Sequence, residues 1–432
     1  MSSPFALPEP DRVGREHSER LAALIDERVA RGPLPFLDYM ALALYTPGLG
    51  YYMAGAPKFG AEGDFVTAPE LSPVFGQCLA AQCREVLAAL VAPVAGATDE
   101  GGTHEAGTRG ASAPGAGAPG GDVEPGVLEL GAGSGRLAAS VIAAFGERPP
   151  RYTILEPSAE LRARQRTLLS TELPDAAFAR VEWIDTLPAR VDGVILANEV
   201  MDALPVERFV RWRGRTLQVC VERSDGGGAV GGADRARFND ATRPAPDALA
   251  DAVATIETDL GHALPDGYTS ELCPSLGPWV ASLGDALGRG VVLLADYGYP
   301  RRELYLPERA SGTLACYYRH RTHDDPYFWP GLQDITAHVD FTRVAEAGTG
   351  AGLALLGYAT QAAFLLGCDL TGLAEHRRDA LGTEAARIED ARAVRTLTLP
   401  GEMGERFQFI AFGKDYDRAL RGFELQDLTH RL

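Results

Sequence analysis

The stretch Val127-Leu-Glu129-Leu-Gly131-Ala-Gly133-Ser134-Gly135-Arg136 carries the strongest fold signal in the chain. Its first four residues suit a short buried strand, and a helix is expected from Arg136 to Phe145. A glycine-rich turn between a strand and a helix lets a ligand approach the backbone closely, because glycine has no Cβ and the first helical turn leaves N–H groups unpaired. The stretch therefore predicts a ligand-binding βα unit.

The same turn discriminates between cofactors. A dinucleotide-binding turn needs Gly or Ala three residues after its second glycine, where the helix packs on the strand, and Arg136 occupies that place. The acidic Glu129 just before the turn suits a cofactor with an amino-acid moiety rather than a pyrophosphate, and the pattern resembles motif I of class I methyltransferases. We therefore expect S-adenosylmethionine as the cofactor. The expected contacts are Glu129, Gly131, Gly133, Ser134 and Gly135.

Two further acids are candidate cofactor ligands. Glu156 ends a second apolar strand, Tyr152–Leu155, where a carboxylate can accept both ribose hydroxyls. The alternative is that Glu156 caps the next helix, although Ser158 is the better cap. Asp185 follows a third, weaker strand and is expected either at the adenine amino group or as a solvated turn residue.

Strands and helices alternate through the centre of the chain, which predicts an α/β fold of the doubly wound, mostly parallel, Rossmann-like kind. Further strands are expected at 193–197 and 290–295, with closing strands at 353–359 and 407–412. Residues 206–222 suit a hairpin, and 224–234 a glycine-rich loop. Helices are expected at 15–31, 36–45, 73–90, 159–171 and 248–262.

Three regions follow from this pattern. Residues 1–94 form an N-terminal helical region with a loop rich in glycine and aromatic residues. Residues 95–126 contain few large apolar side chains, and we expect a flexible linker or insert there. Residues 127–432 form the catalytic core, with an inserted substrate-binding region at about 206–285.

The reacting centre is expected where the strands end, because ligands of open α/β sheets bind at the carboxyl edge. Asn198, Glu199 and Asp202 follow the fourth strand, with Asn198 expected at the cofactor. If the methyl acceptor is an arginine, carboxylates match its guanidinium group and offset its charge beside a sulfonium. Glu199 and Asp202 are the first candidates, with Asp64 and Glu271 behind them. The alternative is a capped helix start, with Asn198 as the N-cap.

Composition excludes some classes of protein. The 432 residues carry a formal net charge of -18, which argues against a nucleic-acid partner. Six scattered cysteines indicate reduced thiols. His320 and His323 have a spacing compatible with metal ligands, but no closed ligand set accompanies them, so we expect no metal. The chain has no signal-peptide pattern and no stretch that suits a bilayer span, so we expect a cytoplasmic protein without membrane insertion.

Taken in order, these motifs are similar to those of the MidA-like methyltransferases, a family that includes the mitochondrial complex I assembly-factor methyltransferase. The matching blocks are Tyr39-Met40 with Pro47–Tyr52, Gly63–Thr67 with Pro69–Ser72 and Phe75-Gly76, Glu129–Gly135, Ala197–Glu199 with Asp202–Pro205, Pro330-Gly331 with Asp334–Thr336 and Val339–Phe341, and Met403-Gly404. The resemblance implies a class I methyltransferase fold with helical additions and S-adenosylmethionine as cofactor. It also implies arginine methylation of a protein, the known type of target being a respiratory complex I subunit. No transit peptide is evident, so a mitochondrial location is not carried over.

Other functions stay open at this point. Tyr51, Tyr52 and Phe65 suit the floor of a small-molecule pocket or a lid over the cofactor. A small-molecule methyltransferase is therefore one alternative. A second alternative is an assembly factor that binds the cofactor without essential catalysis. The sequence leaves monomer and homodimer both open.

Overall fold

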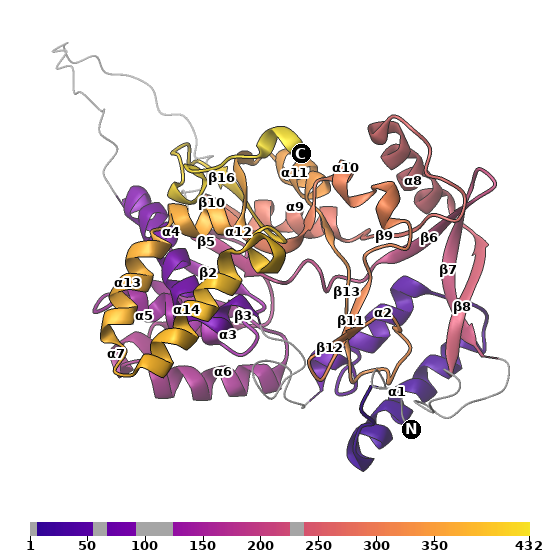
Figure 1. Cartoon of the computed structure of the whole chain (residues 1–432), viewed down its shortest axis with the longest axis horizontal. Helices are drawn as coiled ribbons and strands as arrows, with labels where there is room; N and C mark the ends of the chain where they lie inside the picture. The colour runs from indigo at the N-terminus through magenta and orange to yellow at the C-terminus, as the bar shows by residue number, and fades with distance from the viewer. Residues whose placement is uncertain (1–6, 55–66, 92–123, 225–236) are drawn as a thin grey trace, which may run out of the picture.

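The computed structural model describes residues 7–54, 67–91, 124–224 and 237–432. Within them, the central sheet has the strand order β15-β16-β10-β5-β2-β3-β4, with β14 beside β10 (Figure 1). Strands β2, β3, β4, β5 and β10 run parallel, and β16 is antiparallel to both of its neighbours. The bounds are β2 Gly126–Leu130, β3 Arg151–Leu155, β4 Val181–Ile184, β5 Val191–Asn198, β10 Leu287–Tyr299, β14 Val339–Asp340, β15 Ala354–Thr360 and β16 Phe407–Lys414. The expected doubly wound, mostly parallel α/β sheet is confirmed.

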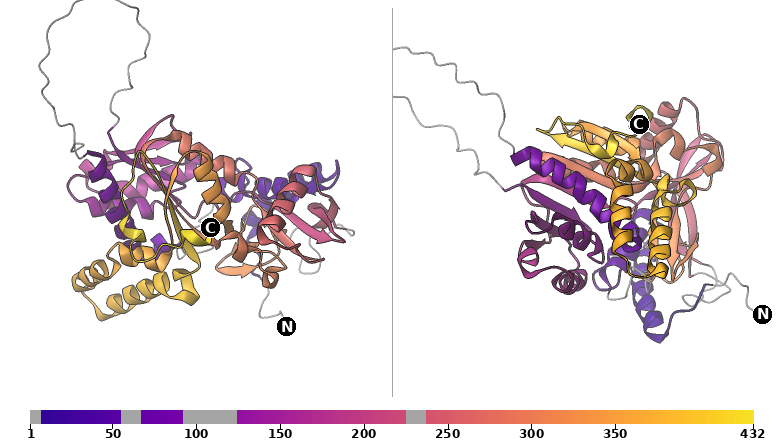
Figure 2. Two further views of the ribbon diagram at one scale, coloured as in Figure 1. Left: turned by 90° about the horizontal axis from the view of Figure 1, so that it is seen from above. Right: turned by 60° about the vertical axis from the view of Figure 1, so that its left-hand side comes forward.

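Helices cover both faces of this sheet because the strand side chains alternate between two apolar cores. In β10, Val291 and Leu293 face the core formed with α4, α5 and α12, whereas Val292 and Leu294 face the core formed with α9 and α11. Figure 2 shows helices on both faces of the sheet. The helix bounds are α1 Arg12–Val29, α2 Phe36–Tyr45, α3 Ala68–Leu71, α4 Pro73–Val91, α5 Arg136–Phe145, α6 Ala159–Glu172, α7 Asp175–Phe178, α8 Asp247–Leu260, α9 Leu276–Ala286, α10 Arg301–Leu304, α11 Phe341–Gly350, α12 Gln361–Gly367, α13 Leu370–Ala380 and α14 Glu384–Thr398.

A second lobe lies beside the carboxyl edge of the central sheet (Figure 1). It contains an antiparallel sheet, in which β8 pairs with β7 of the path β1-β7-β6-β9, and a small sheet of order β12-β11-β13. The strands are β1 Leu34–Pro35, β6 Glu207–Trp212, β7 Arg215–Arg223, β8 Phe238–Pro244, β9 Thr269–Leu272, β11 Ala315–Tyr318, β12 Arg321–His323 and β13 Asp334–Thr336. The predicted hairpin at 206–222 is therefore present as β6 and β7.

The N-terminal region is divided between the two lobes. Helices α1 and α2 share an apolar core with residues from 315 to 337, including Trp329 and Ile335. Helix α4 packs instead on α5 and the central sheet. The described helices of this region therefore belong to two different apolar cores. The expected linker lies outside the described residues except for 124–126, as does the glycine-rich loop after Ser224.

Helix α4 corrects one expectation. Pro73–Val91 has the length and apolar composition of a membrane span, which the sequence analysis overlooked. More than half of this span is buried inside the protein, with Phe75, Cys78 and Leu79 fully enclosed. Its apolar composition is thus explained by packing in the core of the central lobe.

Three glycines form a row across adjacent strands at the amino edge of the sheet. Gly126, Gly193 and Gly290 are in register on β2, β5 and β10. Gly193 and Gly290 have φ values of +127° and +126°, and a Cβ on Gly193 would lie 2.0 Å from the carbonyl oxygen of Gly126. The strands can approach in this geometry only without side chains.

We predict that Gly193→Ala destabilises the protein by roughly 3–5 kcal/mol, the sum of an overpacked contact and a strained backbone. Urea denaturation followed by circular dichroism measures this free energy. Gly214→Ala is the matched control, because Gly214 also has a positive φ (+70°) but has open space at its Cβ position. The control should lose about 1 kcal/mol. Equal losses in the two variants would contradict the steric explanation.

Candidate functional site

A cavity of about 250 Å³ lies at the carboxyl ends of β2, β3 and β5. The glycine turn after β2 borders it, and so do the residues that follow β3 and β5. Tyr52 and Asp334 close it from the second lobe. The cavity therefore sits where the topology of the sheet predicts a ligand site.

The glycine turn after β2 borders the cavity and also forms a hydrogen bond to the neighbouring strand β3. Gly131, Gly133 and Gly135 all have positive φ values, of 65°, 53° and 91°. Gly131 and Gly133 line the cavity, and the N–H of Gly131 donates to the carbonyl of Leu155 at 3.2 Å. Gly135 is the N-cap of α5 and does not line the cavity. Its expected contact with the cofactor thus stays a prediction.

Gln165 connects the turn to the predicted ribose acid. Its side-chain amide donates to the carbonyl of Gly133 at 2.9 Å and to the carboxylate of Glu156 at 3.2 Å, and its own oxygen accepts from Trp183 Nε1 at 3.0 Å. Gln165 is fully buried. One side chain therefore fixes the spacing between two walls of the cavity.

Sequence reasoning missed Gln165, although a signal was available. Residues 161, 165 and 169 form the buried stripe of α6, and Leu161 and Leu169 flank the glutamine there. A polar residue at the centre of an apolar stripe requires internal hydrogen-bond partners.

Glu156 is anchored at the start of α6 and also borders the cavity, and its role toward a ribose stays a prediction. Ser158 is the N-cap of α6 and accepts from the N–H of Leu161. Glu156 accepts from the N–H of Ser158 at 2.9 Å, yet it also lines the cavity beside Leu155 and Pro157. A carboxylate can accept about four hydrogen bonds, so this anchoring is compatible with a role toward a ribose.

Glu129 lies at the end of β2 with its carboxylate buried. The hydroxyl of Tyr152 donates to it at 2.6 Å. Burial raises its pKa to about 7, although the Tyr152 hydrogen bond opposes that rise. A cationic group in the cavity would offset the cost of ionising it.

The chain after β5 is held by a single buried carboxylate. Asp296, at the carboxyl end of β10, accepts from the N–H groups of Val200, Met201 and Asp202 at 3.1, 2.9 and 3.3 Å. It also accepts from its neighbour Tyr297. From the sequence, Asp296 is a candidate catalytic group because it lies at the end of a strand; in the structure its carboxylate determines the path of residues 200–202.

Glu199 adopts the left-handed backbone region, with φ of 54°. Its N–H donates to the carbonyl of Ala295 at 2.9 Å, and its carboxylate accepts from Asn198 Nδ2 at 2.9 Å. No regular helix begins here, so the alternative of a capped helix start is wrong. A non-glycine residue in this region costs about 1–2 kcal/mol, and such strain concentrates at functional sites.

Three carboxylates, those of Glu199, Asp202 and Asp334, line the cavity, and the first lies close enough to the other two for their charges to raise its pKa. Burial raises the pKa of Glu199 to about 8, with Asp202 contributing, and burial raises that of Asp202 to about 6. Asp334 accepts from the hydroxyl of Tyr52 at 2.9 Å, and one oxygen of Asp202 is buried without a hydrogen-bond partner among the described residues. The arrangement suits a cationic ligand.

The remaining candidates are placed as follows. Ser134 lines the cavity and donates to Glu70, and Asn198 also lines it. Asp185 is exposed and is not part of the cavity lining, and Glu271 belongs to a different cavity. Asp64 and Phe65 lie outside the described residues.

Metal binding gains no support in the part of the chain that the structure describes. No group of three or more His, Cys, Asp or Glu side chains is arranged to hold a metal ion there, and His320 and His323 are no exception.

Known proteins with similar sequences share one chemistry. A family model described as "Putative S-adenosyl-L-methionine-dependent methyltransferase" matches residues 117–359. The chain is 38% identical to a protein of Burkholderia thailandensis whose crystal structure contains S-adenosyl-homocysteine, with a TM-score of 0.83 over 99% of this chain and 100% of that one. It is 26% identical to the mitochondrial protein arginine methyltransferase NDUFAF7 of Mus musculus, over 88% of this chain and 81% of that protein. The NDUFAF7 of Danio rerio is 27% identical, over 90% and 86%.

The pKa of Glu129 generates a prediction for S-adenosyl-homocysteine, the ligand of the Burkholderia structure. Its amino group is cationic below about pH 8, so it should favour the ionised carboxylate. Because burial places this pKa at about 7, we expect the affinity to rise by up to roughly tenfold from pH 6 to pH 8.

Isothermal titration calorimetry across this range measures the effect. Glu129→Gln should remove most of the pH dependence, whereas Glu182→Gln, an exposed acid on β4, should keep it. A slope that is identical in the wild type and Glu129→Gln would rule out Glu129 as its source.

Proposed function

Since the chain belongs to the MidA-like family of S-adenosylmethionine-dependent methyltransferases, we propose that its methyl acceptor is an arginine side chain of a protein substrate. The observation that carries the proposal is the group of three carboxylates, Glu199, Asp202 and Asp334, in the cofactor cavity. The curated relatives named above support it, because they are protein arginine methyltransferases.

The cofactor supplies an electrophilic methyl group on a sulfonium. Residues of this chain fit its three parts. The apolar side chains of Leu155 and Leu161 would lie along the adenine, and Glu156 would accept from the ribose hydroxyls. The turn at Gly131 and Gly133 leaves backbone space for the amino-acid end, with Glu129 as the acid for its ammonium group.

A guanidinium group needs negative charge when it approaches a sulfonium, since both are cations. Carboxylates bind guanidinium through paired N–H···O bonds. Asp202 has an oxygen without a partner in the described protein, and Asp334 is oriented by Tyr52. These two acids are therefore the proposed clamp, and they would hold the accepting nitrogen in line with the methyl group.

The accepting nitrogen must lose a proton as its bond to carbon forms and the carbon–sulfur bond breaks. Glu199 is the proposed proton acceptor. Burial raises its pKa to about 8, which matches a base that works near neutral pH better than an ordinary glutamate does. Its fixed backbone and its hydrogen bond from Asn198 would keep the carboxylate aimed at the acceptor.

Within this proposal, a subunit of respiratory complex I is the first protein substrate to test, because the family resemblance suggests that target. A small-molecule acceptor is the second candidate. The stacked rings of Tyr45 and Tyr52, whose centroids lie 5.6 Å apart at the cavity, favour it because they would suit a flat substrate. An assembly factor without essential catalysis is the third candidate.

One experiment separates these candidates. The protein is incubated with radiolabelled cofactor and with a lysate from a strain in which the gene for this protein is deleted. The labelled species are then separated and analysed by mass spectrometry. Label in methylarginine of a protein is the expected result. Label confined to small molecules would refute the proposal, as would complementation of the deletion strain by a variant without transferase activity.

For Glu199→Gln, we expect methyl transfer to fall by about 10²–10⁴-fold, the usual worth of a general base. Glutamine keeps the size and one hydrogen-bond acceptor but takes no proton, so the affinity for S-adenosyl-homocysteine should change less than about threefold. Transfer is measured with the labelled substrate and affinity by calorimetry. Glu182→Gln serves as the control variant. Full activity of Glu199→Gln would remove Glu199 from the mechanism.

A further inference from the structure

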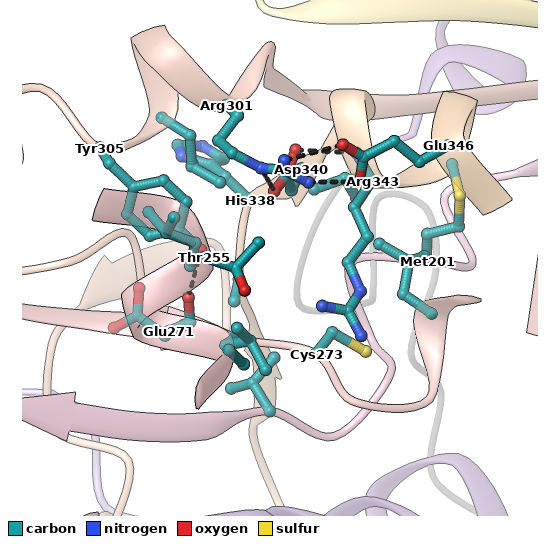
Figure 3. Close-up of a pocket in the computed structure, with 18 residues that line it drawn as sticks. Met201, Thr255, Glu271, Cys273, Arg301, Tyr305, His338, Asp340, Arg343 and Glu346 are labelled. Atoms are coloured by element: carbon teal, nitrogen blue, oxygen red, sulfur yellow. Dashed lines mark hydrogen bonds and ion pairs between the residues drawn. The ribbon is translucent and has the colours of Figure 1, made fainter. Parts of the chain in front are cut away.

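A second cavity, of about 140 Å³, lies between the two lobes on the other side of residues 200–203 (Figure 3). Helices α8, α9 and α11 border it, together with β9 and the chain before α11. One part of its wall is apolar and includes Ile256, Leu272 and Leu276. The proposed transferase mechanism uses none of these residues.

Arg343 distinguishes this cavity from an ordinary packing defect. Its side chain extends from α11 into the cavity toward Cys273 (Figure 3). Its Nε is buried without a hydrogen-bond partner, and no ion pair of Arg343 exists among the described residues. The rest of the side chain is partly exposed, so the guanidinium is a cation at the cavity wall that is open to pairing with a ligand.

The acids near Arg343 have partners of their own. Glu271, which lines the cavity, accepts from the N–H and the hydroxyl of Thr313 through one of its oxygens, and Arg301 binds the others. Arg301 binds Asp340 at 3.1 Å and Glu346 at 2.6 Å, and it also binds Asp259. Asp340 additionally caps α11 by accepting from the N–H of Arg343. The side chains of Glu346 and Asp259 are about half exposed, at 55% and 41%, so solvent screens much of their charge.

Uncharged polar groups that can form hydrogen bonds also line the cavity. His338 is partly exposed, but its Nδ1 is buried without a hydrogen-bond partner among the described residues, and desolvation lowers its pKa to about 4, so the ring is neutral near pH 7. The hydroxyl of Thr255 donates to the carbonyl of Asp251 and can therefore accept from a ligand. The cavity thus combines one cation without an ion pair, the buried carboxylate of Glu271, neutral hydrogen-bonding groups and an apolar wall.

We propose that this cavity binds a small carboxylate with a short apolar chain, whose charged end pairs with Arg343. A free metabolite and the aspartate or glutamate side chain of a docked protein both present this group. The site is independent of the proposed methyl acceptor, because the two cavities share no charged residue.

A ligand in the second cavity would also lie against the backbone segment that carries Asp202. Met201 and Ala337 line the second cavity. The N–H of Met201 donates to Asp296, and that of Ala337 donates to the carbonyl of Asp202 at 3.0 Å. An occupant would therefore contact the backbone that positions Asp202.

The test measures binding of butyrate and isovalerate to the full-length protein by calorimetry, with the corresponding amides as uncharged probes. We expect the carboxylates to bind and the amides not to bind. Arg343→Met, which keeps the length and removes the charge, should weaken carboxylate binding about tenfold or more. Arg302→Met, an exposed arginine on the neighbouring α10, should bind as the wild type does.

Two blocked peptides identify the source of the carboxylate. One contains glutamate and the other contains glutamine at the same position. Selective binding of the glutamate peptide indicates a protein side chain, whereas binding of free carboxylates alone indicates a metabolite, and both results support the site.

The same titrations can overturn the proposal. It fails if no probe binds, or if carboxylates bind Arg343→Met as tightly as the wild type. If Arg343 instead serves the fold, Arg343→Met should melt at a lower temperature and Arg343→Lys should not restore binding. S-adenosyl-homocysteine affinity is measured on the same samples, so loss of the cofactor site would be detected separately.

Discussion

The reacting end of the molecule depends on the buried carboxylate of Asp296. Four backbone N–H groups donate to this side chain. Three belong to residues 200–202, and the fourth belongs to Tyr297. These amides would otherwise be orphaned where β5 ends, since residues 200–202 belong to no helix or strand that would pair them. With them satisfied, the chain can turn sharply enough to place Glu199 in the left-handed region and to aim Asp202 toward the cavity.

That arrangement gathers acids that repel one another. Burial and the charges of Asp202 and Glu199 raise the pKa of Asp296, and burial likewise raises the pKa values of Glu199 and Asp202. An acid whose pKa is raised on folding binds more protons in the native state. Its contribution therefore lowers stability as the pH rises through the interval between its unfolded and folded pKa values. The site is destabilised by its own charge until cations enter it.

The local features of this site were predictable from the sequence, and the long-range ones were not. The βα unit at 127–145 and the acid at 156 depend on short-range periodicity and turn chemistry, which the sequence contains in contiguous form. Asp334 comes to the cavity from a segment that showed no regular alternation, through the pairing of β11 with β13. The division of the N-terminal helices between two lobes has the same cause, because their apolar faces match partners about 300 residues later in the chain.

Charge balance links the two ends of the cavity. The cofactor brings a sulfonium and an ammonium, and a guanidinium acceptor would bring a third positive charge. In the proposed arrangement, Glu129 would face the amino-acid end of the cofactor, and Glu199, Asp202 and Asp334 would face the acceptor. Each cation lowers the pKa of the carboxylates beside it, so cofactor and substrate would progressively convert the acids from partly protonated to ionised. A carboxylate that is protonated in the empty site can neither clamp a guanidinium nor take its proton. Binding of the cations would therefore itself prepare Glu199 as a base, and the same acids would select against a neutral acceptor that brings no charge to offset them.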